Sequence, residues 1–172
     1  EELNVDRIEI ASARVSEGEL NSVREVTQWT QSSGHDQRIE ILTFVDSGTS
    51  IDWMIQSGAK VQNLLTKGSI NHLKHQLKKT PDQHFKAIEE NVLAAQKEGI
   101  STNVYLEDWS NGMRNSPDYV KDYLSFISNL PVKRVLLPDT LGVMTYYETF
   151  SFISEVVKNH PQIHFDFHGH ND

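Results

Sequence analysis

The chain has 172 residues, of which 37% are hydrophobic and 23% are charged, as is usual for one soluble globular domain. Its formal net charge of −8 argues against nucleic acid or an anionic membrane surface as the main partner. Cysteine is absent, which excludes disulfide bonds and thiolate metal sites, and no apolar run approaches the ~20 residues of a membrane span. We therefore expect a cytoplasmic protein.

Strand-like and helix-like segments alternate along the chain. In chain order we predict a strand over 8–11, a helix over about 16–32, a strand over 39–45, a helix over 50–55, a strand over 61–65, a helix over 81–97, a strand over 102–106, a helix from 116 to about 128, a strand over 134–137, a helix from 145 to about 159 and a strand over 163–168.

Capping signals mark several of these helix starts. Ser16 with Glu19 and Thr145 with Glu148 have the spacing of a capping box, and Thr80 stands before a proline. Glycine at 34, 58 and 99 ends three of the helices. Short strands alternating with capped helices predict a parallel sheet that helices cover.

The fold class that this pattern favours is α/β, as a partial (β/α)8 TIM barrel. Predicted strand starts lie about 20 to 40 residues apart, which brackets the ~30 residues of one barrel unit. The rival is a doubly wound open sheet, but no strand here is followed by G-x-G-x-x-G. Polar residues instead follow several strands, at the edge where barrel enzymes build their sites: Asp46, Lys67, Glu107, Asp108, Asp139, Thr140, His168 and His170.

His168 and His170 form the strongest local signal. Residues two apart on a strand point to one face, so both imidazoles leave the end of the last strand together, as two ligands of one cation would. The alternative is a pair of hydrogen-bonded polar histidines at a strand end. The position at the catalytic edge of a barrel favours metal binding. Asp166 has the same parity, and either orients an imidazole or is a polar residue of the barrel interior.

Tyr105 and Glu107 share a face at the end of another strand. A carboxylate there could act as a base toward a carbon acid, and the alternative is a structural salt bridge with Arg114 or Lys67. Thr140 ends a further strand, where its hydroxyl could bind a substrate carboxylate or only shape the turn.

Six other histidines carry no comparable pattern. His72 and His75 have helical spacing among lysines, which favours a solvated basic face over a metal site. We expect the remaining histidines to be structural or surface residues: His35, His84, His160 and His164.

The segments 137–142 (LPDTLG) and 167–172 (FHGHND) resemble, in this order and spacing, the α-isopropylmalate synthase superfamily of metal-dependent barrels. Homocitrate synthase, citramalate synthase and hydroxymethylglutaryl-CoA lyase belong to the same superfamily. The resemblance covers the whole chain. The segments 105–119, 41–46 and 63–69 are most similar to the citramalate synthase branch.

The resemblance implies a role for each matching residue. His168 and His170 correspond to ligands of a divalent metal (Mn, Mg or Zn), Thr140 to a residue that contacts the 2-oxoacid, and Glu107 to the proposed base acting on acetyl-CoA. The residues similar to those that shape the oxoacid pocket are Leu42, Phe44, Leu65 and Tyr105. The family aspartate of an Arg-Asp-Gly motif is not found, and Tyr146 stands where the family often has proline.

The implied activity is an acyltransferase reaction, in which acetyl-CoA condenses with a 2-oxoacid. Bulky side chains around the pocket favour pyruvate, which would give (R)-citramalate for isoleucine biosynthesis. The alternatives are a 2-isopropylmalate or homocitrate synthase, a carbon–carbon lyase, and a non-catalytic metal- or effector-binding scaffold.

The matching segments correspond to strands two to seven of the family barrel. We therefore expect residues 1–172 to be an incomplete catalytic barrel, truncated at both ends, and inactive by itself. The full-length protein is expected to form a homodimer, with the oxoacid and acetyl-CoA as its small-molecule partners and no nucleic acid or membrane partner.

Overall fold

The computed structural model describes residues 5–35 and 38–170. One six-stranded sheet carries the fold, and helices connect its strands. In chain order the elements are β1 (Ile8–Ser12), α1 (Glu17–Ser33), β2 (Ile39–Phe44), α2 (Thr49–Ser57), β3 (Val61–Lys67), α3 (Ile70–His72), the π-helix η2 (Leu73–Leu77), α4 (Pro81–Lys97), β4 (Ser101–Glu107), α5 (Trp109–Asn115), α6 (Pro117–Ile127), β5 (Val132–Asp139), α7 (Tyr146–Asn159) and β6 (Phe165–Gly169).

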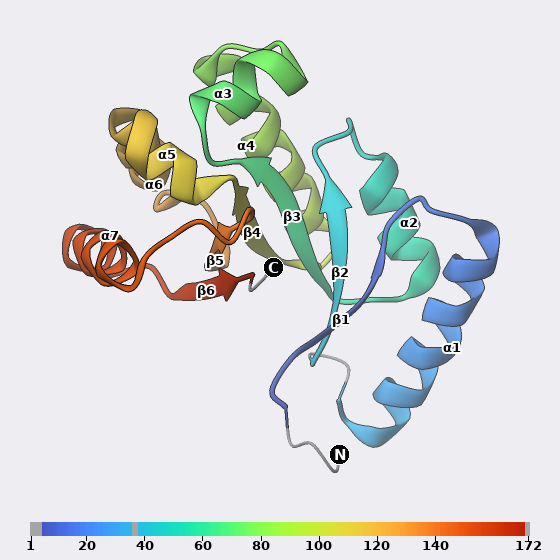
Figure 1. Ribbon diagram of the computed structural model, residues 1–172. Coiled ribbons are helices and arrows are strands. Elements are labelled where there is room, and N and C mark those ends of the chain that lie inside the picture. The colour runs from blue at the N-terminus through green and yellow to red at the C-terminus, as the bar shows by residue number, and fades with distance from the viewer. Residues whose placement is uncertain (1–4, 36–37, 171–172) are drawn as a thin grey trace.

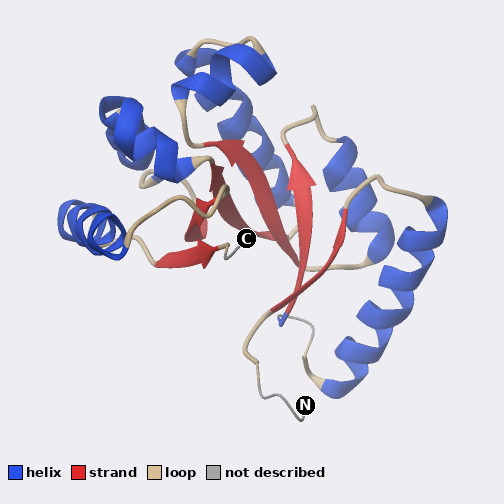
Figure 2. Ribbon diagram, in the orientation of Figure 1, coloured by secondary structure: helices blue, strands red, loops and turns tan. Residues whose placement is uncertain are grey.

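The strands follow one another across the sheet in the order β1-β2-β3-β4-β5-β6, and every neighbouring pair is parallel. The sheet curls, and the helices lie along its outer side (Figures 1 and 2). A doubly wound sheet would interrupt the sequential order. The prediction of a partial (β/α)8 barrel is therefore confirmed, with six of the strands such a barrel contains.

Helix capping follows the sequence signals closely. Thr80 and Thr145 each form a complete capping box, while the Ser16 side chain accepts the amide N–H of Glu19 at 3.1 Å. Gly34 ends α1 in the left-handed conformation at φ 74°. Three short elements at the carboxyl edge were not predicted, namely α3, η2 and α5.

The hydrophobic core lies between the outer face of the sheet and the helices. The larger buried cluster joins Leu64, Leu106 and Leu137 of three strands to Trp109 and Tyr123, each at most 1% exposed. Such burial removes apolar side chains from water and supplies most of the stabilisation. Within the described residues, no helix is both long enough and apolar enough to cross a membrane.

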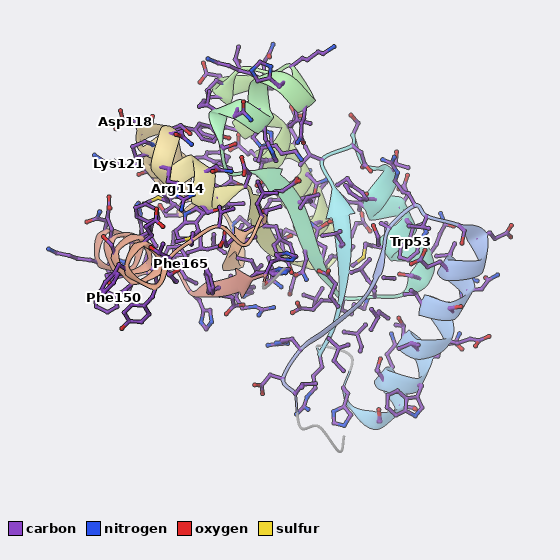
Figure 3. The ribbon with its side chains drawn as sticks, in the orientation of Figure 1. Trp53, Arg114, Asp118, Lys121, Phe150 and Phe165 are labelled. Atoms are coloured by element: carbon purple, nitrogen blue, oxygen red, sulfur yellow. The ribbon has the colours of Figure 1, made fainter. Side chains whose placement is uncertain are left out.

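A second core cluster fills the space between β1, β2 and helices α1 and α2. Trp53 of α2 belongs to it and is 7% exposed. By contrast, Phe150 of α7 is 68% exposed and projects away from the sheet (Figure 3).

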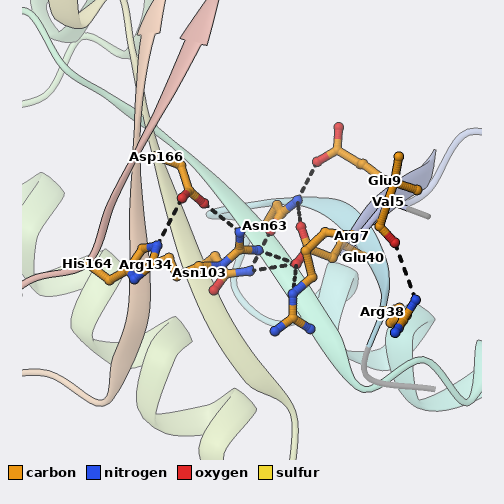
Figure 4. Close-up of polar contacts among 10 residues, drawn as sticks. All are labelled: Val5, Arg7, Glu9, Arg38, Glu40, Asn63, Asn103, Arg134, His164 and Asp166. Carbon is orange, nitrogen blue, oxygen red and sulfur yellow. Dashed lines mark hydrogen bonds and ion pairs between the residues drawn. The ribbon is translucent and has the colours of Figure 1, made fainter. Parts of the chain in front are cut away.

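The inner face of the sheet carries a polar layer near the amino ends of the strands, here called the amino-end network: Glu40, Asn63, Asn103, Arg134 and Asp166. Glu40 accepts N–H groups from Asn63 at 3.0 Å and from Asn103 at 3.3 Å, and it pairs with Arg134. Arg134 also donates to Asp166 at 2.5 Å (Figure 4). The network thereby joins β2 to β6.

Candidate active site

A cavity of about 220 Å³ opens on the inner face of the sheet, beyond the amino-end network toward the carboxyl ends of the strands. Strands β1 to β6 and the loop after β5 contribute its lining: Glu9, Leu42, Leu65, Tyr105, Glu107, Pro138, Thr140, His168 and His170. Seven of the eight residues that the sequence singled out for the site therefore meet in one cavity. The register of the parallel strands brings them together, because Tyr105 pairs with Leu65 and Pro138 with His168.

The two histidines lie side by side at the end of β6. Their ring centroids are 4.9 Å apart with an angle of 14° between the ring planes. The edge of Tyr105 lies against His168, with 5.6 Å between ring centroids. Partial burial and the neighbouring His170 lower the pKa of His168 below its ordinary value. The neutral form, which binds metals, is therefore favoured at neutral pH.

The donor chemistry of this pair fits a divalent cation, since two adjacent imidazoles suit Zn, Mn and related ions. Within 5–35 and 38–170, no group of three or more His, Asp or Glu side chains is arranged to hold a metal ion. A complete site thus needs a further ligand in addition to His168 and His170.

Glu107 is one of two carboxylates that line the cavity, with Glu9, and it has a cationic neighbour in Lys67. It forms an ion pair with Lys67 of β3, and its Oε1 is 3.9 Å from Nδ1 of His72. Arg114, the other salt-bridge partner considered from the sequence, instead binds Glu148 with two hydrogen bonds of 2.8 Å. The Lys67 pair fixes the carboxylate at the cavity wall.

Thr140 follows β5 and faces the same cavity. Its Oγ1 accepts the backbone N–H of Asp108 at 2.9 Å, so its hydroxyl hydrogen is directed elsewhere and can serve a ligand. Gly142 closes the loop at φ 61°, where a Cβ atom would lie 3.2 Å from the carbonyl oxygen of His170. The loop after β5 therefore passes close to the end of β6.

Leu42, Leu65 and Tyr105 form the apolar part of the cavity lining. Burial raises the pKa of Tyr105 to about 12, so its hydroxyl remains protonated. Phe44, which was expected to join them, is not among the lining residues. The guanidinium of Arg14 instead lies 5.8 Å from the centre of its ring.

Asp166, for which two roles stood open, is engaged away from the histidine pair. It binds Arg134 at 2.5 Å and His164 at 3.1 Å. These contacts lie at the amino end of the sheet, and they favour the structural role.

The sequence did not single out Glu9, which lines the cavity from β1. Its Oε2 accepts an N–H from Asn63 at 2.6 Å, while partial burial and nearby Glu40 raise its pKa. The segment around Glu9 offered no motif, because its place in the cavity depends on how β1 lies against β2 and on the contact with Asn63 of β3.

The expectation for His72 was wrong. Its side chain is 19% exposed and faces Glu107 and Asp108, whereas His75 is exposed as expected. A local signal was present: Ser69 caps the short helix by accepting the amide N–H of His72 at 3.1 Å. That Ser-x-x-His spacing directly after a strand turns His72 toward the site.

The fold and its cavity define a barrel of parallel βα units with a polar site at the carboxyl edge, the arrangement of barrel enzymes. The family model described as HMGL-like matches residues 1–172. The chain belongs to the HMGL-like family.

Relatives in this family include several synthases. The chain is 27% identical over 172 residues to a 2-isopropylmalate synthase of Sulfurisphaera tokodaii, covering 99% of this chain and 42% of that protein. It is 25% identical over 173 residues to an (R)-citramalate synthase of Methanocaldococcus jannaschii, covering 100% of this chain and 33% of that protein. The chain therefore spans less than half the length of either relative.

Solved structures support the fold assignment. The HMG-CoA lyase of Bacillus subtilis superposes with a TM-score of 0.71 at 14% identity, covering 97% of this chain and 57% of that one. The HMG-CoA lyase of Pseudomonas aeruginosa gives a TM-score of 0.67 at 16% identity, covering 96% of this chain and 56% of that one. At these identities the likeness concerns the fold only.

Proposed function

We propose that this chain is the central part of an enzyme that condenses acetyl-CoA with a 2-oxoacid, with pyruvate as the oxoacid and (R)-citramalate as the product. The observation that carries the proposal is the shared cavity, in which a carboxylate, a hydroxyl and two adjacent imidazoles converge: Glu107, Thr140, His168 and His170. Relatives named as 2-isopropylmalate, homocitrate and citramalate synthases support the reaction type.

The residues have complementary roles in this reaction. His168 and His170 would hold a divalent metal ion, which when bound supplies Lewis acidity to a keto oxygen. Thr140 donates its hydroxyl hydrogen to the oxoacid carboxylate. Glu107 removes a proton from the acetyl methyl group, and the carbon electron pair attacks the keto carbon. Hydrolysis of the thioester then releases CoA.

Leu42, Leu65 and Tyr105 support pyruvate as the oxoacid, because the space beside the polar groups is small and apolar. A pocket of this kind discriminates by only ~1–3 kcal/mol against one extra methylene, so substrate preference is measured as a ratio. The 2-isopropylmalate and homocitrate reactions are the competing outcomes.

We also propose that residues 1–172 form an incomplete barrel and are inactive by themselves, because the two histidines need a third ligand. The full-length protein is proposed to form a homodimer. Condensation activity in the 172-residue chain would contradict the incomplete site.

The test measures release of free CoA by the full-length protein with pyruvate and with 2-oxoisovalerate. Pyruvate is expected to give the higher kcat/KM, and Glu107→Gln to lower kcat by about 10³-fold. Glu89→Gln, an exposed carboxylate on α4, is the matched control and is expected to keep full activity. Faster turnover of 2-oxoisovalerate would assign 2-isopropylmalate synthesis.

Two further outcomes would replace the proposal. Cleavage of a 3-hydroxyacyl-CoA without condensation would identify a lyase. Calorimetric binding of Mn²⁺ or Zn²⁺ with no turnover of any substrate would identify a non-catalytic scaffold.

A further inference from the structure

His72 lies between two carboxylates at the carboxyl edge of the sheet. Its Nδ1 is 3.9 Å from Oε1 of Glu107, and its Nε2 is 3.5 Å from Oδ2 of Asp108. The Nδ1 atom is buried and has no hydrogen-bond partner in the described part of the chain. A buried polar atom without a partner is destabilising, and this one lies 3.9 Å from the carboxylate of the proposed base.

Hydrogen bonds hold the Asp108 carboxylate where it can orient the imidazole of His72. The residue is 2% exposed, and its two carboxylate oxygens accept hydrogen bonds from Asn111 at 2.7 Å and from Ser69 at 2.6 Å. Its backbone is in the left-handed region at φ 66°, which aspartate adopts more readily than most residues. In this conformation Thr140 accepts its N–H and Ser69 donates to its carboxylate.

The two carboxylates beside His72 line different cavities. Glu107 lines the cavity of about 220 Å³, whereas Asp108 lines a separate, more polar cavity of about 490 Å³ between η2 and α5. His72 stands between the two carboxylates, and therefore between the proposed reaction cavity and an outer polar space.

We propose that His72 is a positioning residue that relays the proton taken up by Glu107, with Asp108 fixing its tautomer. The inference rests on the proposed function. Neutral His72 directs its Nε2–H toward Asp108 and its Nδ1 lone pair toward Glu107. When the methyl C–H bond breaks, the electron pair stays on carbon and the proton goes to Glu107. Glu107 then passes the proton to Nδ1, and the resulting imidazolium is stabilised by the Asp108 carboxylate.

The alternative is that His72 only packs the loop, which a spectroscopic readout separates from the relay. Nitrogen NMR of the 172-residue chain, with the His72 signals assigned by their loss in His72→Gln, reports which ring nitrogen carries the proton. The relay predicts the Nε2–H tautomer in the wild type and a shift toward the Nδ1–H form in Asp108→Asn. An Nδ1–H tautomer in the wild type, or no change in the variant, overturns the proposal.

The kinetic arm uses the full-length enzyme. His72→Gln is expected to lower kcat, and the exchange of acetyl-CoA methyl hydrogens with deuterium from solvent, by about 10²-fold, with both KM values unchanged. Added imidazole is expected to restore part of the activity of His72→Ala. His164→Gln, a histidine whose side chain is 66% exposed before β6, is the matched control and keeps wild-type rates.

The two possible failures are distinguishable. Wild-type exchange and condensation that persist unchanged in His72→Gln overturn the relay and leave the proposed function in place. A wild-type enzyme that condenses no 2-oxoacid overturns the proposed function, and the relay with it.

Discussion

The two ends of the curled sheet's inner face are both polar, but their groups are used differently. At the amino end, Glu40 is 5% exposed by its side chain and receives N–H groups from Asn63, Asn103 and Arg134. At the carboxyl end, Glu107, Thr140 and the two histidines line a cavity, and the buried Nδ1 of His72 has no hydrogen-bond partner among the residues that the structure describes.

The amino end of the inner face therefore stabilises the fold, whereas the carboxyl end keeps groups available for a ligand. A polar network whose members satisfy one another joins the strands and fixes the curl of the sheet. A catalytic edge must keep donors and acceptors available for a ligand, so its charges contribute less to folding. Substitutions at the two ends should therefore change different quantities.

The largest expected effect on folding is at the amino end. Arg134→Met leaves the buried Glu40 carboxylate without its main counter-charge and should lower the unfolding free energy by about 3–5 kcal/mol in urea denaturation. The double variant with Glu40→Gln should recover part of this loss. Lys133→Met, at the exposed neighbouring position on β5, is the control. If Arg134→Met and Lys133→Met lowered the unfolding free energy by the same small amount, the amino end would not have this stabilising role.

A pH effect is expected from His84, which supports the carboxyl end by accepting the N–H of Lys67 at 3.2 Å. Burial, with the charges of Lys79 and Lys67, lowers the pKa of His84 to about 4. The unfolded chain, with an ordinary pKa of about 6.5, binds the proton more readily. Stability is therefore present above pH 6.5 and is lost as the pH falls toward 4, by about 3 kcal/mol at most.

The check is urea denaturation between pH 7 and pH 4.5 for the wild type and His84→Gln. Because other carboxyl and histidine groups titrate alike in both proteins, the difference between the two curves isolates His84. The variant should show the flatter dependence on pH. Parallel curves would mean that this buried histidine takes no part in acid sensitivity.

A steric effect of similar or smaller size is expected where α5 meets the turn after β3. A Cβ atom on Gly112 would lie 2.0 Å from the carbonyl oxygen of Gly68, so Gly112→Ala must displace backbone and should cost about 2–3 kcal/mol. Gly18→Ala is the control, since its Cβ would meet only the Ser16 hydroxyl at 3.8 Å. Thermal unfolding that ranks the two variants equally would contradict this account.

The regular part of the fold was predictable because its signals are local. Alternating apolar runs located all six strands, and Thr80 and Thr145 marked helix starts that the structure reproduces. The short elements α3, η2 and α5 were missed because they are too short for periodicity to appear, and one is a π-helix.

The candidate site was predictable to the extent that strand parity determines it. Glu107 and His168 lie near the carboxyl ends of β4 and β6, and parity alone directs them to the inner face. Glu9 and His72 were missed for a different reason. The place of Glu9 depends on a side-chain contact that reaches from β1 across β2 to Asn63 of β3, and that of His72 depends on the path of an irregular loop. Phe44 has the required parity but packs with Arg14.

The smallest expected effect on stability is at the histidine pair, and it completes the contrast with Arg134. His168→Ala with His170→Ala should change the unfolding free energy by no more than about 0.5 kcal/mol, because both rings lie at the partly open edge of the cavity. Zn²⁺ should raise the midpoint of thermal unfolding in the wild type, since an ion that binds only the folded state stabilises it by mass action. The double variant should lose that increase. His164→Ala, which removes a histidine from the amino end of the same segment, should keep it. If Zn²⁺ stabilised the double variant as much as the wild type, the metal would bind elsewhere. The proposal that His168 and His170 hold a metal at the carboxyl edge would then be wrong.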